Sequence, residues 1–205
     1  VGDSRPLGPA KLTVLSPENG SVADPNERAT ALMVEWGSVR LVLGADLEPS
    51  AAWDDVVRRA PASTSHAGLK VAHHGSDAAQ HDELLAGSPG AVRVVTPFAS
   101  KDLPRFGPDG GIARLHRTSP EVRLTALPRA YAGQGGSGGQ KLPRAALEKR
   151  PEISMDPPVT GFPDCFVAIE WDASGQETIH HGAGSVVVTP TSAAPSPAKP
   201  RGRRR

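Results

Sequence analysis

The chain has 205 residues, a net charge of +1 and a single cysteine, with 38% hydrophobic residues. This length can bury the core of one domain, whereas the near-neutral charge gives the folded part no electrostatic basis for binding nucleic acid. The single Cys165 excludes an internal disulfide framework and a multi-cysteine zinc ribbon. Its position at the start of the apolar stretch CFVAIEW favours a small core residue over a nucleophile.

The hydropathy pattern and the first residues predict a soluble, cytoplasmic protein with no membrane partner. No apolar stretch approaches the roughly 20 residues that a membrane-spanning helix needs. The segment VGDSRPLGP has neither the basic nor the apolar region of a secretory signal. Val1 fits either an alternative start codon or a truncated upstream boundary, and the residues do not distinguish these two origins.

Strands and helices alternate along the first two thirds of the chain. Two strands flank Gly37-Ser38, a connection typical of a hairpin, and Pro49 is suited to the first turn of the helix that follows. The alternation predicts an α/β layer with helices packed on a sheet, and the leading hairpin makes that sheet mixed. We expect strands at residues 11–16, 30–36, 39–43, 68–72, 91–97 and 122–127, and helices at 50–60, 82–86 and 108–118, the last with Ile112 and Leu115 on one face.

Composition divides the chain into four parts. Residues 1–128 form the α/β unit, and residues 129–158 are a flexible linker rich in glycine and proline. A small β segment follows at 159–190, with a hairpin turn at 173–176. Residues 191–205 are low in complexity and basic, which predicts a disordered tail. We interpret the arginine cluster at 201–205 as part of a solvated tail rather than as a nucleic-acid contact.

Two of the predicted strands end in residues that can bind a metal. The strand VRLVL is followed by Gly-Ala and Asp46, and the strand GLKVA is followed by His73 and His74. We interpret Asp46 and His73 as a metal-binding pair, because a carboxylate can bridge two divalent cations and a neutral imidazole can complete the coordination of one. If each residue is considered alone, Asp46 is consistent with a helix-capping residue. His73 alone is consistent with a hydrogen-bonded histidine at the surface or the edge of the sheet.

The role of His74 depends on where the strand ends. If strand geometry persists, His73 and His74 cannot face the same metal, because successive side chains point to opposite faces. His73 is then the ligand, and His74 is a partner of a ligand or a substrate contact; if the chain turns early, His74 is the ligand itself. Asp46 and His74 are our candidate catalytic residues. Gly75 allows a close backbone approach, and Ser76 can hydrogen-bond an imidazole or cap the next segment.

The other histidines carry weaker signals. His180-His181-Gly182 looks similar to the first pair, but it lies in a compositionally separate segment, which argues against a metal role. His66, His81 and His116 sit in polar or helical surroundings and need no special role. Residues 96–98, Thr-Pro-Phe, end another strand and either line the wall of the same pocket or simply pack as a loop.

VRLVLGADLE followed by LKVAHHGS resembles the second half of the metallo-β-lactamase-fold metallo-hydrolases, in particular the hydrolase domain of competence-type DNA-internalisation proteins. The family pattern has one strand ending in Thr-Gly-Asp-x-Glu and a later one ending in His-His-Gly-Ser. Here Ala45 stands where glycine is usual, Asp46 is retained, and residues 73–76 match in full. The resemblance runs from about Lys11 to Leu127. It implies the C-terminal half of an αββα sandwich, with Asp46 bridging two zinc (or manganese) ions and His73 binding the second.

The first half of the family's ligand set is missing from this chain. No His-x-His-x-Asp-His motif occurs, and His66 is the first histidine, so no histidine ligand precedes Asp46. The remaining ligands are too few for a stable dinuclear site.

Two hypotheses follow from this departure. The chain is part of a metal-dependent hydrolase, with a phosphodiester favoured over an ester or amide substrate, and a missing N-terminal half or partner chain completes the site. Alternatively, it is an inactive truncated or degenerate half-domain that serves as an interaction module. A half sandwich would expose an apolar sheet face and tend to self-associate. A weaker third idea is nucleic-acid binding through the basic tail.

Overall fold

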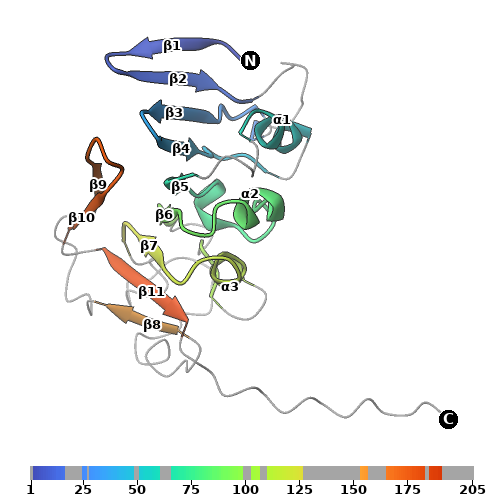
Figure 1. Cartoon of the computed structure of the whole chain (residues 1–205). Helices are drawn as coiled ribbons and strands as arrows, with labels where there is room; N and C mark the ends of the chain where they lie inside the picture. Colours follow the sequence, from blue (N-terminus) through green and yellow to red (C-terminus); the bar gives the residue numbers. More distant parts are fainter. Residues whose placement is uncertain are drawn as a thin grey trace.

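A computed structural model describes residues 2–16, 25–26, 28–48, 51–60, 66–98, 103–106, 110–126, 153–156, 165–182 and 185–190. The predicted basic tail and most of the predicted linker lie outside these residues. Within them the chain forms strands, three α-helices and one short 3-10 turn (Figure 1). The strands are β1 Ser4–Leu7, β2 Ala10–Val14, β3 Leu32–Trp36, β4 Val39–Leu43, β5 Gly68–Lys70, β6 Val92–Val95, β7 Val122–Leu124, β8 Ile153–Asp156, β9 Val167–Trp171, β10 Glu177–His181 and β11 Val186–Pro190. The helices are α1 Ala51–Arg59, α2 Asp82–Ala86 and α3 Gly111–His116, and the 3-10 turn is η1 His73–Gly75.

Nine strands form one mixed sheet in the order β1-β2-β3-β4-β5-β6-β7-β11-β8. The strands from β1 to β4 pair antiparallel, and those from β4 to β7 pair parallel. Strand β11 then pairs antiparallel with both β7 and β8. The predicted α/β class and mixed sheet are therefore confirmed.

The predicted elements of the first two thirds occur in the predicted order. Gly37 has a φ of 56°, the left-handed conformation that a tight turn between β3 and β4 requires. Helix α2 has the predicted bounds, and α3 is shorter than predicted but buries Ile112 and Leu115 as expected. Strand β5 ends at Lys70, two residues before the predicted end, so both histidines of the first pair lie beyond it.

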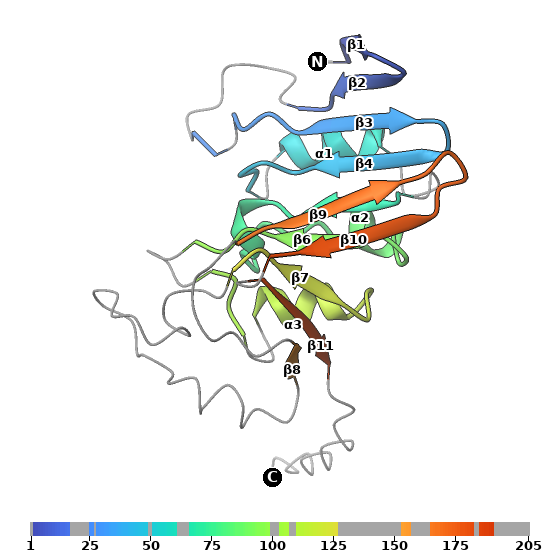
Figure 2. The ribbon, with the colours of Figure 1, turned by 90° about the vertical axis from the view of Figure 1, so that its left-hand side faces the viewer.

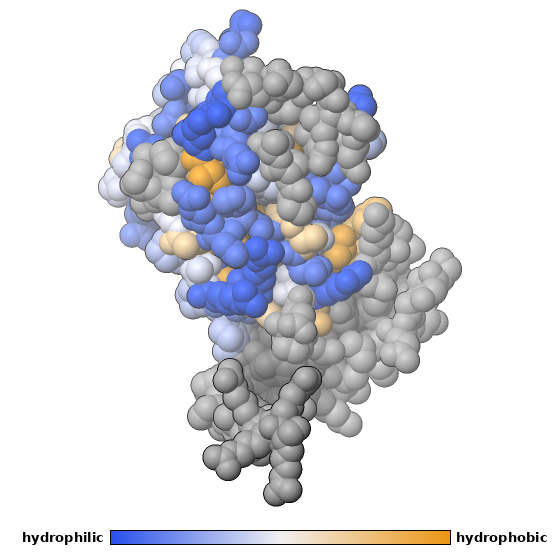
Figure 3. Space-filling view, turned by 90° about the vertical axis from the view of Figure 1, so that its right-hand side faces the viewer, coloured by the Kyte–Doolittle hydropathy of each residue, from blue (hydrophilic) through white to orange (hydrophobic). Residues whose placement is uncertain are grey.

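The three helices cover one face of the sheet, and their outward surface is mostly hydrophilic (Figures 1 and 3). Beneath them, Met33, Val42 and Leu69 are cross-strand neighbours on β3, β4 and β5 and are buried. They belong to one core with Trp53 and Val56 of α1. Each such side chain contributes about 1.5–3 kcal/mol by burial, so the helical face holds the sheet together. None of the described helices is long and apolar enough to span a membrane.

Arg93 is the cross-strand neighbour of Leu69 and points into this same buried layer with an exposed fraction of 1%. Its guanidinium donates hydrogen bonds to the carbonyls of Leu85 and Ser88, at the end of α2, and of Leu115 and Thr118, at the end of α3. Burial lowers the pKa of Arg93 to about 10, which leaves it charged at neutral pH. The cation thus adds a charged donor to carbonyls at both helix ends, three of which also accept a backbone N–H, and it suits the negative end of each helix dipole.

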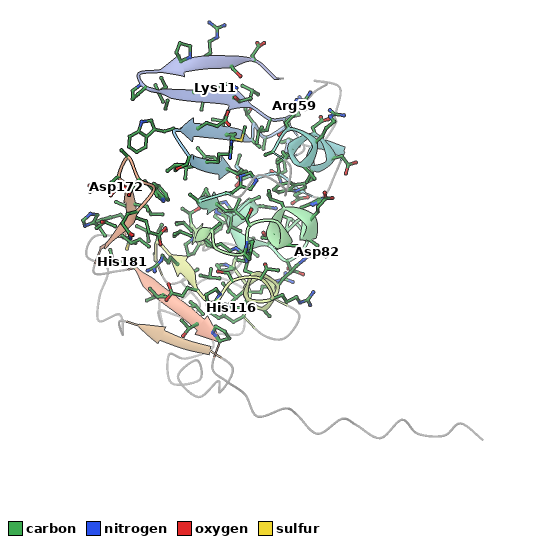
Figure 4. The ribbon with its side chains drawn as sticks, viewed as in Figure 1. Lys11, Arg59, Asp82, His116, Asp172 and His181 are labelled. Atoms are coloured by element: carbon green, nitrogen blue, oxygen red, sulfur yellow. The ribbon has the colours of Figure 1, made fainter. Side chains whose placement is uncertain are left out.

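The hairpin β9–β10 lies against the opposite face of the sheet (Figure 2). Its turn is fixed by Asp172, whose carboxylate accepts hydrogen bonds from the backbone N–H groups of Ser174 and Gln176. Bonds to the Ser174 hydroxyl and to these backbone groups lower the pKa of Asp172. At the other end, His181 lies 2.8 Å from Arg123 of β7, so the hairpin is joined to the sheet (Figure 4).

The C-terminal third differs from the domain division expected from composition. Strand β8 falls inside the expected linker, and β11 falls inside the expected small β segment, yet both belong to the main sheet. The expected hairpin around residues 173–176 is present. Cys165 was expected in the core, and this was wrong: it is exposed, because the strand whose residues alternate toward the sheet begins only at Val167.

His66, which is buried, and His116, which is partly buried, are expected to make the free energy of unfolding depend on pH. One ring nitrogen of His66 lies 3.3 Å from the Ala60 carbonyl and one of His116 lies 3.2 Å from the Ser119 carbonyl. Burial lowers the pKa of both below the ordinary 6.5. The unfolded chain therefore binds more protons than the folded one below pH 6.5, and stability falls as the pH drops through that window.

Urea unfolding between about pH 7.5 and about pH 5.5 measures this dependence. The double variant His66→Gln and His116→Gln should show a shallower loss of stability over that range. The exposed His180, replaced by glutamine, is the matched control and should keep the original slope. An unchanged slope in the double variant would show that other groups are responsible.

Candidate functional site

The candidate site lies at the carboxyl ends of three adjacent parallel strands. Because β4, β5 and β6 run parallel, the segments that follow them meet at one edge of the sheet. The segment after β4 carries Asp46 and Glu48, the one after β5 carries His73 and His74, and the one after β6 carries Phe98. The predicted residues are thus brought to one place by the topology.

Close backbone contact joins the segments after β4 and β5. A Cβ built on Gly44 would lie 2.9 Å from the Cβ of Ala72, so a side chain at position 44 would push the two segments apart. The amide of His73 donates to the carbonyl of Ala45 at 2.9 Å. Ala45 has a φ of 47°, in the left-handed region that favours glycine.

The two histidines lie in a left-handed turn rather than on a strand. His73 and His74 have φ values of 42° and 54°, and Gly75 follows with 75°. Left-handed backbone costs a non-glycine residue about 1–2 kcal/mol, and such strain is typical of functional sites. Strand alternation therefore does not separate the two rings, whose centroids lie 6.1 Å apart. This is the early-turn geometry that the sequence left open for His74.

His74 is oriented by its backbone partner and faces Asp46. Its Nδ1 lies 2.8 Å from the carbonyl oxygen of Thr96; since a carbonyl only accepts, Nδ1 carries the proton. Its Nε2 lies 3.5 Å from Oδ1 of Asp46. Phe98 stacks on the ring, with centroids 4.9 Å apart and an interplanar angle of 21°. This arrangement leaves Nε2 as the ring nitrogen that faces the half-exposed carboxylate of Asp46.

His73 is paired with Glu48 rather than with Asp46. Its Nδ1 lies 2.9 Å from Oε1 of Glu48, without the alignment of a hydrogen bond. Asn26 donates to the same oxygen at 3.2 Å. His73 is buried, with an exposed fraction of 8%. Glu48 belongs to the Asp-x-Glu motif, yet sequence reasoning gave it no role; its place two residues after Asp46 was the available signal.

Lys70 adds a positive charge near this cluster. Its ammonium donates to the carbonyl of Val71 at 2.9 Å. Burial lowers the pKa of Lys70, and the carboxylate of Asp46 opposes that shift.

The donor types at this edge suit zinc, but their number does not. Imidazole nitrogen and carboxylate oxygen are ordinary zinc ligands, and a closed site needs four of them. Across the part of the chain that the structure describes, no group of three or more His, Cys, Asp or Glu side chains is arranged to hold a metal ion. The structure instead brings together two pairs, Asp46 with His74 and Glu48 with His73.

The second histidine pair lies elsewhere. His180 is exposed and lies 3.6 Å from Glu170 across the hairpin. His181 lies 3.3 Å from the hydroxyl of Ser185 and 2.8 Å from Arg123. Burial, with the nearby Arg123, lowers the pKa of His181. These contacts join the hairpin to the sheet and give this pair a structural part.

Comparison with known proteins identifies no relative: no family model matches the chain, and neither the curated proteins nor the solved structures yield a match.

Proposed function

We propose that this chain contributes Asp46, His73 and His74 to the metal site of a hydrolase with the metallo-β-lactamase fold. The observation that carries the proposal is the meeting of Asp46 and His74 at the carboxyl edge of the sheet, with Nδ1 of His74 held by a carbonyl and Nε2 facing Asp46. Under this proposal the sheet, with its helices on one face, is the C-terminal half of an αββα sandwich.

The proposed cofactor is zinc, or manganese in its place, held jointly with a missing N-terminal half or a partner chain. When bound, the metal would supply an activated water for hydrolysis. This chain's part is to provide the carboxylate of Asp46 and an imidazole nitrogen at fixed positions. The pairing with Asp46 favours His74 as the ligand, whereas the family pattern assigns His73. A phosphodiester is the proposed substrate class on the family resemblance alone.

Loss of either member of the pair is expected to weaken zinc binding by the full chain. We expect Asp46→Ala and His74→Ala each to raise the zinc dissociation constant by about tenfold or more, since each removes one donor. Isothermal titration with zinc chloride measures this change. His73→Ala, measured in parallel, shows which histidine is the ligand.

His180→Ala is the matched control, because His180, like His74, is a histidine beside a carboxylate, 3.6 Å from Glu170. It should bind zinc as the unchanged chain does. The proposal fails if the unchanged chain takes up no zinc, or if the His180 variant loses affinity as much as the Asp46 variant.

The alternative is an inactive half-domain that acts as an interaction module. Leu12, Val34 and Leu41 are cross-strand neighbours that share the face away from the helices and are only partly buried. Beside them the β9–β10 hairpin leaves a groove of about 250 Å³, lined by Leu43, Val94 and Ile169 among others. Such an apolar face favours association. A chain that holds no zinc and sediments as a dimer or larger species would support this reading over the hydrolase.

A further inference from the structure

The turn that carries His73 and His74 depends on contacts from outside it. Its own hydrogen bonds run from the Gly75 amide to the Ala72 carbonyl and from the Ser76 amide to the His73 carbonyl, both at 2.9 Å. Two such bonds must hold three consecutive residues in left-handed backbone conformations. A strained conformation of this kind persists only when the surrounding structure adds further constraints.

Gln80 supplies such a constraint from inside the protein. Its side chain has an exposed fraction of 6%. Its Nε2 donates to the carbonyl of Ser76 at 2.9 Å and to the carbonyl of Ala72 at 3.4 Å. These two carbonyls stand immediately before and immediately after the turn, so one buried amide group ties its two ends together.

Helix α3 fixes the segment that links the turn to Gln80. Arg114 donates to the carbonyl of Asp77 at 2.7 Å, and its Nε donates to the carboxylate of Asp82 at 2.9 Å. The segment from the turn to α2 is therefore held at Ser76, at Asp77 and at Asp82. Gln80 thus acts from a fixed position.

We propose that Gln80 is a positioning residue for the candidate site. By closing the ends of the turn, its amide sets where the rings of His73 and His74 stand relative to Glu48 and Asp46. The consequence for metal binding rests on the function proposed above, whereas the consequence for the turn does not. Gln80 acts on the two imidazoles through its hydrogen bonds to the backbone.

The test replaces Gln80 by methionine, which has a similar length but no donor. Ser119→Ala is the matched control, because Ser119 is equally buried at 6% and also donates to a carbonyl, that of Glu121, away from the turn. Hydrogen exchange by NMR should show the Gly75 and Ser76 amides of the Gln80→Met chain exchanging about tenfold faster than in the control, with the Val42 amide of β4 unchanged. Zinc affinity, measured on the same samples, should fall by about tenfold relative to the control.

Each outcome of the exchange and zinc measurements either supports or overturns the positioning role of Gln80. The role of Gln80 is overturned if the Gly75 and Ser76 amides exchange no faster, relative to the control, than the Val42 amide does. It is also overturned if these two amides exchange faster but the zinc affinity does not fall. If the unchanged chain binds no zinc, the proposed function fails, but the exchange result still decides whether Gln80 holds the turn. Should the methionine variant not fold, Gln80→Asn, which keeps the amide but is one methylene shorter, gives the same comparison.

Discussion

Replacing Arg93 by methionine is expected to lower the free energy of unfolding by about 1.5–3 kcal/mol, because it removes the hydrogen bonds made by a buried charged group. The substitution removes a cation whose guanidinium donates to four backbone carbonyls at the ends of α2 and α3. The carbonyls of Leu85, Ser88 and Leu115 each also accept a backbone N–H, at 3.2–3.3 Å, so the expected loss is that of the hydrogen bonds to the buried cation. Urea unfolding followed by circular dichroism measures the loss.

Arg58→Met is the control for this prediction. Arg58 pairs with the carboxylate of Asp55, and its side chain is 59% exposed, so its removal should cost no more than about 1 kcal/mol. Arg93→Lys should recover only part of the stability, because an ammonium cannot reach several carbonyls as a planar fork does. A loss below about 1 kcal/mol in Arg93→Met would contradict the assignment of Arg93 as the link between the two helix ends.

Replacing Gly111 by alanine is expected to destabilise the fold by about 2–3 kcal/mol, the cost of overpacking a close contact. A Cβ built on Gly111, the first residue of α3, would overlap the carbonyl oxygen of Gly75 and lie 3.2 Å from the amide nitrogen of Asp77. Both atoms are backbone, so neither can move aside without shifting the turn that holds His73 and His74. Thermal unfolding measures the stability, and the NMR signals of the His74 ring report the shift of the turn.

Gly90→Ala provides the matched control. A Cβ at Gly90 would meet nothing within 4 Å, and its φ is not in the left-handed region. It should therefore leave stability unchanged or raise it slightly through the unfolded chain. If the Gly111 variant is as stable as the Gly90 variant, the close approach of α3 to the turn is not what holds the two segments together.

Both predictions concern the same physical link between the helical face and the candidate site. Arg93 holds the ends of α2 and α3, and Gly111 and Arg114 set α3 against the segment that follows the histidines. The turn at the sheet edge therefore depends on the packing of the helices. Destabilising that packing is expected to disturb the positions of His73 and His74 before the sheet itself unfolds.

The sequence was sufficient to locate the local elements of the first two thirds of the chain. Runs of apolar residues at strand and helix periods predicted β2 to β7 and α1 to α3 in order, because such periods reflect the geometry of a single element. The residues of the candidate site were also evident, since Asp46 and the two histidines each follow a predicted strand. Parallel pairing of β4 with β5 then places them at one edge.

Only the tertiary structure decided which residues meet. Strand β11 lies between β7 and β8 in the main sheet, a pairing between segments far apart in sequence that local composition does not encode. His74 rather than His73 faces Asp46, because the backbone turns left-handed after Ala72. The partners of Arg93 and Gln80 are likewise backbone carbonyls, and every residue carries one. Periodicity indicates which face a residue prefers, whereas its contacts depend on long-range packing, and that packing decides that Asp46 meets His74.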